Sequence, residues 1–240
     1  MKLTFIGTRG EIEARTELHA RHTSLLVEYG RQRVMIDAGR DWLDRLDAYR
    51  PHAVVVTHAH PDHAFGLQHG APCPVWLPPA SREALRAYPI DDPRELPHRV
   101  PTTVEGIVFE AFPVEHSIRA PAVGYRVSAG SATIWYSPDV LHIPDRSEAL
   151  GGARLYIGDG ATMERSFVRR HGSTLVGHAT VRTQLGWCEK EGVPRALITH
   201  CGSEIVEGDP TELNERLAAM AEKRGVEAAI ACDGMEVEVR

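Results

Sequence analysis

A dense run of potential metal ligands follows a short apolar segment, and it constrains the fold more than any other feature of the sequence. Residues 53–56 (Ala-Val-Val-Val) are rich in β-branched side chains, which predicts a buried strand. The residues that follow are Thr57-His58-Ala59-His60-Pro61-Asp62-His63. Because proline fits neither a sheet ladder nor a helix interior, we expect Pro61 to exclude both at the ligands. The ligands should therefore lie at a strand-to-loop junction, where α/β proteins usually place their chemistry.

The spacing of these ligands suggests two metal ions. Alternate side chains of an extended segment face the same way, so His58 and His60 can reach one ion together. Asp62 and His63 follow the bend at Pro61 and turn toward a second position. The alternative is a histidine-rich surface loop without an ion. Three histidines and one aspartate within six residues at a strand end favour the metal site.

This stretch resembles the metallo-β-lactamase superfamily, whose HxHxDH signature matches it at His58, His60, Asp62 and His63. The resemblance implies an α/β fold with a four-layer αβ/βα sandwich. It also implies three further ligands downstream, each at the end of a strand. Residues 196–200 repeat the strand-then-Thr-His pattern of residues 53–58, which agrees with the twofold internal layout of such a sandwich.

The downstream ligands that the resemblance implies are His116, Asp139 and His200. His116 follows the apolar run 107–114 and would join the first two histidines of the motif. Asp139 follows the run 133–136 and would bridge both ions, because each of its oxygens can bind one metal. His200 would complete the second site with the Asp-His pair and Asp139. Without the resemblance, a histidine after a strand is usually structural, and an aspartate before a loop forms a turn.

Three more aspartates are candidates for supporting the ligands from behind. The resemblance gives this part to Asp37, at the end of the strand 33–37, although a plain turn is an equally good interpretation. Asp159 lies at the tip of the strand 155–160. Asp233 begins a two-residue Asp-Gly turn of the type that hairpins favour, here between strands at 228–231 and 235–239.

Length and composition favour one domain, residues 1–240, in a reducing compartment. The chain has 240 residues, 42% of them hydrophobic, which is enough for one well-buried domain. The net charge of -6 argues against general nucleic-acid or anionic-membrane binding. No apolar run approaches a membrane span, and the first residues are too soon interrupted for a signal peptide. Four scattered cysteines indicate neither disulfides nor a cysteine-based zinc site, so we expect a cytoplasmic protein.

Several polar segments have no assigned role. Residues 8–22 are long enough to form a mobile loop over a site, and their histidines, His19 and His22, are expected to face solvent. Residues 161–174 are charged and could form a lid or a solvated face. Residues 89–103 are expected to be a surface excursion. The residues near predicted ligands that could hold phosphate are Arg21, Ser117, Arg119 and Ser203.

Helical periodicity is predicted in three places. A short amphipathic helix should bury Trp42 and Leu46 before the metal strand. A second helix should open at residues 177–180 and end near Gly192. A third should begin at Asp209 as its cap, with proline at the first helical position.

The finer resemblance is to the phosphodiesterase branch of the superfamily, which contains PhnP and RNase Z. The features that carry it are Arg21-His22-Thr23-Ser24, His116 followed by Gly124-Tyr125, His178 upstream of Ile198-Thr199-His200, and Asp233-Gly234-Met235-Glu236. The cysteine-rich zinc site of the first protein and the long basic arm of the second have no counterpart here. These features imply a small or cyclic phosphodiester as substrate rather than tRNA.

The resemblance also implies a mechanism. Two cations would share a water whose pKa is lowered toward neutrality, and the resulting bridging hydroxide would attack phosphorus while the cations clamp the phosphate oxygens. His178, a non-ligand in the family pattern, is the candidate general acid for the departing alkoxide; the alternative is an uncommitted histidine near a helix start. Ligands rich in imidazole and free of thiolate favour zinc, with manganese or iron as alternatives.

Two other activities use the same scaffold. A lactonase or thioesterase would direct the same seven ligands at a carbonyl, with less need for His178. A di-iron redox centre is a third reading, which the lack of a flavin-binding partner domain in this sequence disfavours. The sequence does not identify the substrate or the metal, and it does not decide whether the protein is a homodimer.

Overall fold

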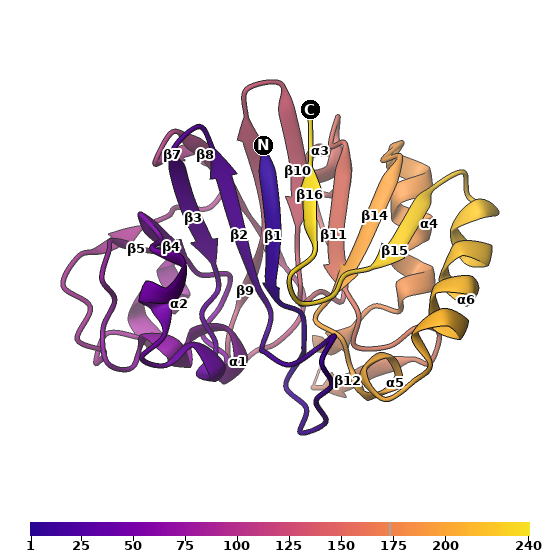
Figure 1. The fold of residues 1–240 in the computed structure, drawn as a ribbon, viewed down its shortest axis with the longest axis horizontal. Helices are drawn as coiled ribbons and strands as arrows, with labels where there is room; N and C mark the ends of the chain where they lie inside the picture. Colours follow the sequence, from indigo (N-terminus) through magenta and orange to yellow (C-terminus); the bar gives the residue numbers. More distant parts are fainter. Residues whose placement is uncertain (173) are drawn as a thin grey trace.

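Two seven-stranded sheets form the frame of the structure, a computed structural model that describes residues 1–172 and 174–240. The first sheet has the order β16-β1-β2-β3-β4-β5-β6 and the second the order β15-β14-β11-β10-β9-β8-β7 (Figure 1). The strands of the first sheet are β1 (Lys2–Gly7), β2 (Ser24–Tyr29), β3 (Gln32–Ile36), β4 (Ala53–Val55), β5 (Val75–Leu77), β6 (Pro93–Glu95) and β16 (Glu236–Glu238). Those of the second are β7 (Thr102–Val104), β8 (Ile107–Val114), β9 (Ala122–Ala129), β10 (Ala132–Tyr136), β11 (Leu155–Asp159), β14 (Arg195–Thr199) and β15 (Glu227–Ile230).

The two sheets share one apolar core. Val27 and Ile36 of the first sheet belong to the same buried cluster as Phe109 and Val127 of the second. Side chains of successive strand residues point to opposite faces, so the other face of each sheet must be covered by something else. Helices provide this cover on both outer faces (Figure 1). The predicted αβ/βα sandwich is thereby confirmed.

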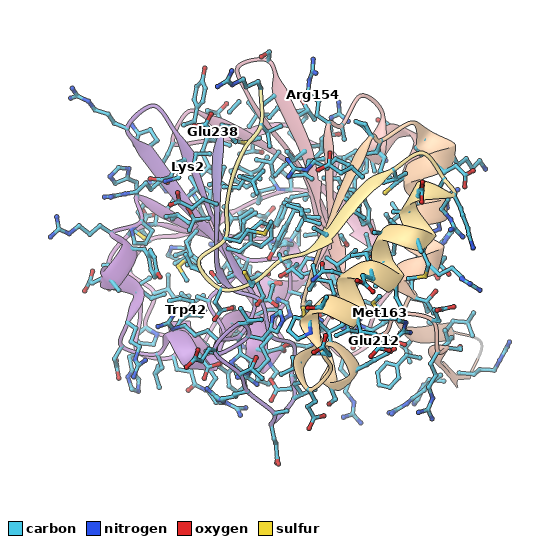
Figure 2. The ribbon with its side chains drawn as sticks, turned by 45° about the vertical axis from the view of Figure 1, so that its right-hand side comes forward. Lys2, Trp42, Arg154, Met163, Glu212 and Glu238 are labelled. Carbon is cyan, nitrogen blue, oxygen red and sulfur yellow. The ribbon has the colours of Figure 1, made fainter. Side chains whose placement is uncertain are left out.

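The helices divide between the two outer faces. The first face carries α1 (Pro61–Ala64), α2 (Pro79–Ala84) and the 3-10 turns η1 (Arg40–Trp42), η2 (Leu46–Tyr49) and η3 (Phe65–Leu67). The second carries α3 (Arg146–Leu150), α4 (Val181–Glu191), α5 (Ser203–Val206) and α6 (Pro210–Glu222). Trp42 and Met163, which pack into these two outer layers, lie on opposite sides of the sandwich (Figure 2).

One end of the sandwich carries the loops that matter for chemistry. The short helices α1 and α5 lie at this end, together with a separate ribbon of β12 (Phe167–His171) and β13 (Thr174–His178) (Figure 1). The two chain termini lie at the opposite end, where Lys2 and Glu238 are paired across β1 and β16 (Figure 2). Strand ends from both sheets therefore meet near α1, α5 and the ribbon.

The two longest helices, α4 and α6, begin at capping residues that accept hydrogen bonds from the first turn. The Asp209 carboxylate accepts hydrogen bonds from the backbone N–H groups of Thr211 and Glu212, and Pro210 follows it, as predicted. Thr180 caps α4 in the same way, and Gly192 ends it with a φ of 70°. The second helix thus starts at Val181, whereas residues 177 and 178 end strand β13, so the expected helix start at 177–180 is wrong by a few residues.

The prediction for the two last strands is wrong in topology. β15 pairs with β14 in the second sheet, and β16 pairs with β1 in the first, so the two strands do not form a hairpin. Gly234 does adopt the positive φ, 87°, of a tight turn. The local turn signal was therefore real, but packing sends the chain from one sheet to the other after it.

Three other segments differ from expectation. The helix expected around Trp42 is a pair of 3-10 turns, η1 and η2, that bury Trp42 and Leu46. The surface excursion at 89–103 contributes β6 and part of β7 to the sheet edges. The charged segment 161–174 includes strand β12, and residue 173 lies outside the described residues. Across the described part of the chain, no helix combines the length and apolar character that crossing a membrane requires.

Candidate metal centre

Strand ends deliver most of the predicted ligands to one place. β4 leads into His58 and His60, β8 into His116, β10 into Asp139 and β14 into His200. The carboxyl ends of these strands lie at the same end of the sandwich, which is where α/β sheets commonly place their sites. Segments separated by more than a hundred residues therefore converge on one cluster.

Asp62 and His63 lie in the first turn of α1, which begins at Pro61. The expectation that Pro61 excludes a helix at the ligands is wrong, because the first helical position does not use its N–H. The helix lies directly against Gly39, where a Cβ atom would stand 1.9 Å from the carbonyl oxygen of Asp62. This close approach fixes both ligands against the loop after β3.

Three histidines and one aspartate form the first group of potential ligands: His58, His60, His116 and Asp139. The Nε2 atom of His58 lies 2.9 Å from Nδ1 of His60 and 3.2 Å from Oδ2 of Asp139. The Nε2 atom of His116 lies 3.3 Å from the same His60 nitrogen. Four potential ligand atoms thus surround one small volume.

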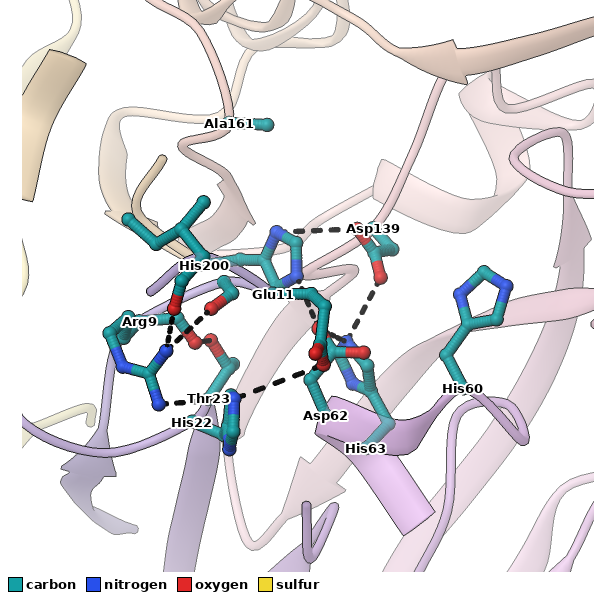
Figure 3. Close-up of polar contacts among 12 residues, drawn as sticks. Arg9, Glu11, His22, Thr23, His60, Asp62, His63, Asp139, Ala161 and His200 are labelled. Atoms are coloured by element: carbon teal, nitrogen blue, oxygen red, sulfur yellow. Dashed lines mark hydrogen bonds and ion pairs between the residues drawn. The ribbon is translucent and has the colours of Figure 1, made fainter. Parts of the chain in front are cut away.

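A second group shares Asp139 and adds Asp62, His63 and His200. The Nε2 atom of His63 lies 2.9 Å from Asp139 Oδ2 and 3.2 Å from Asp62 Oδ2. The Nε2 atom of His200 lies 3.0 Å from Asp62 Oδ2, and its Nδ1 lies 3.2 Å from Asp139 Oδ1. Figure 3 shows Asp139 between His60 and His200. The two groups therefore meet at one carboxylate.

The buried carboxylate of Asp37 sets the orientation of two of these rings. It accepts hydrogen bonds from the N–H of Thr57 at 2.7 Å, from the Thr57 hydroxyl at 2.8 Å and from Nδ1 of His63 at 2.9 Å. The Thr57 hydroxyl gives its one proton to Asp37, so it accepts from Nδ1 of His58 at 3.0 Å. Both rings therefore carry their proton on Nδ1, and their Nε2 lone pairs face the cluster.

The ring of His116 is oriented in the same sense by the backbone. Its Nδ1 lies 3.1 Å from the carbonyl oxygen of Gly177, which can only accept a hydrogen bond. Three Nε2 lone pairs thus face the Asp139 carboxylate, although acceptors do not hydrogen-bond to acceptors. Buried atoms without a hydrogen-bond partner in the described residues include His63 Nε2, His200 Nδ1 and Asp139 Oδ1. An array of this kind fits divalent cations, which supply the missing positive charge.

The pKa shifts of the rings differ between the two groups. Burial lowers the pKa of His58 well below its usual value and lowers the pKa of His60 to about 4. Burial also lowers the pKa of His116. Burial alone would lower the pKa of His200, but the carboxylates led by Asp139 raise it to about 10. Burial would also lower the pKa of His63, but the carboxylates led by Asp62 raise it well above its usual value. The first group is therefore neutral at its rings, as cation binding requires, whereas the rings of the second group must release a proton when a cation binds.

His178 belongs to neither of these two groups; its potential ligand atom lies close to those of Asp139, Asp159 and His200, which form a third set. Its Nδ1 lies 2.7 Å from Oδ2 of Asp159, a fully buried carboxylate at the end of β11. Asp159 also accepts from the N–H groups of Val140 and Ala161, which hold it in place. Burial would lower the pKa of His178, but Asp159 outweighs it and raises that pKa. Asp159 thus orients His178, a contact that the sequence did not indicate. The Nδ1 atom of His178 also lies 3.3 Å from Oδ1 of Asp139.

The cluster opens into a cavity of about 810 Å³. Its floor holds five of the seven predicted ligands and His178, and its walls come from three segments: 10–12, 161–167 and 202–204. Within residues 1–172 and 174–240, this wall includes Ser203 but not Arg21, Ser117 or Arg119. Three of the four predicted phosphate contacts are therefore not brought to the cavity.

Arg165 and Phe167 line the cavity, whereas sequence reasoning treated the segment 161–174 only as a whole, as a lid or a solvated face. The only hint was one aromatic residue amid the charged segment 161–174. Arg165 is exposed and forms none of the ion pairs found among the described residues. Among the described residues that line the cavity, it is the one basic side chain, apart from the histidines, that could meet an anion.

The base of the 8–22 loop is packed rather than free. His22 and His19 are buried, so the expectation that both face solvent is wrong. Nδ1 of His22 lies 2.7 Å from the Asp41 carboxylate, which also binds the buried Arg9 guanidinium at 2.6 Å. Glu11, farther along the loop, reaches the cavity wall. This loop is thus held at its base, and residues 10–12, close to that base, border the site.

Asp233 supports that loop and not the ligands. Its carboxylate accepts hydrogen bonds from the Thr8 hydroxyl at 2.7 Å and from the N–H groups of Ala20 and Arg21, both at 3.1 Å. The sequence-based assignment of Asp233 to the surroundings of the ligands is corrected by these contacts. Thr8 also binds Nδ1 of His19 at 2.8 Å, which accounts for the burial of that histidine.

Comparisons with known proteins agree with this geometry. A family model described as the beta-lactamase superfamily domain matches residues 32–201. Ribonuclease Z of Mycobacterium bovis (strain BCG / Pasteur 1173P2) is 22% identical over 244 residues, which cover 83% of this chain and 85% of that protein.

Solved structures share the fold along nearly the whole chain. The metallo-beta-lactamase fold protein YhfI from Bacillus subtilis has a TM-score of 0.77 and 19% identity, and 98% of each chain is covered. A diphosphatase from the PhnP family has a TM-score of 0.71 and 22% identity, covering 100% of this chain and 98% of that one. Similarity thus points toward the PhnP and ribonuclease Z proteins, as the sequence motifs predict.

Proposed function

Because the chain belongs to the beta-lactamase superfamily, we propose that it is a hydrolase that depends on two divalent cations and cleaves small phosphodiesters. The observation that carries this proposal is the pair of His178 and Asp159, 2.7 Å apart, on the floor of the cavity beside the ligand groups. An oriented imidazole next to a candidate metal centre is suited to protonating a departing alkoxide. The similarity to ribonuclease Z and to a diphosphatase from the PhnP family supports phosphate chemistry.

The cations would be held by seven side chains. His58, His60 and His116 would hold the first, and Asp62, His63 and His200 the second, with Asp139 between them. The imidazole-rich, thiolate-free set favours zinc, with manganese or iron as alternatives. When bound, such ions supply a water of lowered pKa and offset the negative charge that develops on a phosphoryl group. The support for this assignment is the set of buried acceptor atoms that face one another in each group.

The chain's own residues complete the chemistry. Asp37 and Thr57 keep the Nε2 lone pairs of His58 and His63 directed at the cluster. Asp159 holds Nδ1 of His178 and leaves the other ring nitrogen for the oxygen that departs. Arg165 on the cavity wall is placed to meet the anionic substrate. These roles need no residue outside the described cavity and its supports.

The experiment that tests this proposal varies the departing group. We expect His178→Ala to lower turnover of aryl methyl phosphodiesters by about 10²- to 10⁴-fold when the departing group is unsubstituted phenol. The loss should be small for p-nitrophenol, because a good leaving group needs no acid. His171→Ala is the matched control, since His171 is an exposed histidine on the same ribbon.

A screen of one preparation decides the substrate class. It should contain bis(p-nitrophenyl) phosphate, a cyclic phosphodiester, a short RNA, a lactone and a thioester. We expect hydrolysis of the phosphodiesters, with the small ones preferred over RNA because the net charge of the chain is -6. Activity confined to the lactone or thioester would contradict the proposal and favour a carbonyl hydrolase. A preference for RNA would show that the substrate is larger than proposed, while the reaction would still be phosphodiester hydrolysis.

A further inference from the structure

The phenyl ring of Phe167 is exposed to 46% although it lines the cavity above the ligand groups. Its neighbours in sequence are Arg165, Ser166, Val168 and Arg169, of which only Val168 is apolar. An aromatic side chain left half in solvent beside a site often contributes to ligand binding rather than to the core. The exposed part of the ring is therefore open to contact with a ligand in the cavity.

Strand pairing places Phe167 next to His178. The two residues face each other across the ribbon of β12 and β13, and their ring centroids lie 5.3 Å apart at an angle of 41°. Directly paired residues share one face of a ribbon, so both rings point to the same side. That side is the cavity, because both residues line it. The ring of Phe167 is thus held at a fixed place beside the candidate general acid.

A general acid must contact the oxygen that departs, so the surroundings of His178 are the surroundings of the departing group. We propose that Phe167 forms the wall of a subsite for that group, and that the group carries a flat aromatic ring, such as a nucleobase. This inference rests on the proposed function, because His178 marks the departing side only if it is the acid. Phe167 would act on specificity and not on the chemical step.

The size and charge of the cavity agree with such a group. A volume of about 810 Å³ lies within the range of pockets that bury a whole small-molecule ligand, and a phosphate group alone would leave most of it empty. The guanidinium of Arg169 lies 5.6 Å from the centre of the Phe167 ring, a cation–π contact that places a positive charge beside this wall. Arg165, two residues away, could meet the phosphate that joins the two halves of the substrate.

The test compares two phosphodiesters whose departing sugars are the same, one with a nucleobase and one without. The departing oxygen has the same acidity in both, so any preference reports on the ring. Stacking of a base on an aromatic side chain contributes about 5- to 150-fold, and we expect a preference of this size in kcat/KM. Phe167→Ala should remove it, Phe167→Leu should keep only a small part, and Phe167→Trp should keep or increase it. Val168→Ala is the control, because Val168 is exposed on the opposite face of the strand.

A second measurement needs no turnover. The indole of Phe167→Trp should lose fluorescence when a nucleoside monophosphate is added, and ribose 5-phosphate should have little effect. Equal binding of the two ligands, or an unchanged base preference in Phe167→Ala, would overturn the inference. If the protein hydrolyses no phosphodiester, the proposed function fails, and the fluorescence result still decides whether the aromatic subsite exists.

Discussion

Replacing Asp37 by Asn should weaken metal binding at the second ligand group more than at the first. The side chain keeps its size, and Asn tolerates the left-handed backbone of this position, φ 63°, as well as Asp does. The amide oxygen can still accept the hydrogen bond from the Thr57 N–H, which is 2.7 Å long in the wild type. The amide nitrogen, however, would face Nδ1 of His63, which in the wild type donates to Asp37 at 2.9 Å.

Two donors cannot share that contact, so the proton of His63 must move to Nε2, which faces Asp62 and Asp139. This removes one ligand lone pair from the second group. A hydrogen bond to a charged group contributes about 1.5 to 3 kcal/mol, which corresponds to a loss of about 10- to 100-fold in metal affinity. The first group should lose less, because the Thr57 hydroxyl can still donate to the remaining oxygen, at 3.0 Å.

The assay is a competition titration of the metal-free protein with zinc and a chromophoric chelator. We expect one of two zinc equivalents to weaken by that factor in Asp37→Asn. Asp233→Asn is the control: its carboxylate also accepts three hydrogen bonds, but from the 8–22 loop, so both affinities should stay unchanged. Wild-type affinity for both equivalents in Asp37→Asn would refute the account of how His63 is oriented.

Three other perturbations follow from the same contacts. Asp159→Asn should lower turnover in the same way as His178→Ala, by about 10²-fold or more for poor leaving groups and little for good ones. Its metal content should be unchanged; loss of bound metal would show that Asp159 binds the ions instead. Gly39→Ala should destabilise the fold by about 1 to 3 kcal/mol in chemical denaturation, because its Cβ would meet the backbone of Asp62, whereas Gly186→Ala, with open space around it in α4, should be neutral or stabilising. Burial lowers the pKa of His22 from 6.5 to about 4 despite the nearby Asp41, so the free energy of unfolding should fall as pH drops from 6.5 toward 4, by at most about 3 kcal/mol. His22→Gln should flatten this slope, and an unchanged slope would show that folding does not lower the pKa of His22.

The sequence predicted the parts of this molecule that local pattern determines. Residues 53–56 read as a strand because apolar β-branched residues stop abruptly at polar ones, and β4 lies there. Periodicity and capping likewise predicted α6 from Asp209 onward. The metal motif placed its four side chains within a few residues of each other, so little tertiary information was needed to bring them together.

The rest depended on contacts between distant segments. His19 and His22 look like surface residues in a polar stretch, and only the packing of Arg9, Asp41 and Thr8 makes them buried. The ribbon of β12 and β13 has exposed residues along the whole of its first strand, so no hydrophobic alternation reveals it. For the same reason, Phe167 could not be placed near His178 from the sequence.

Asp233 shows the limit of a local signal. Its Asp-Gly turn is real, but the two strands on either side pair in different sheets. The side chain then reaches Thr8, 225 residues away, and not the ligands. A turn motif specifies the bend of the chain, whereas the partner strands are chosen by burial across the whole fold.

The metal content of the purified protein, loaded with zinc and passed through gel filtration, tests the central claim most directly. Mass spectrometry of the elements should find two zinc ions per chain in the wild type. Asp139→Ala, which removes the carboxylate common to both groups, should retain at most one. A wild type with fewer than two ions, or an Asp139→Ala protein that still holds two, would contradict the arrangement in which seven side chains hold a pair of cations.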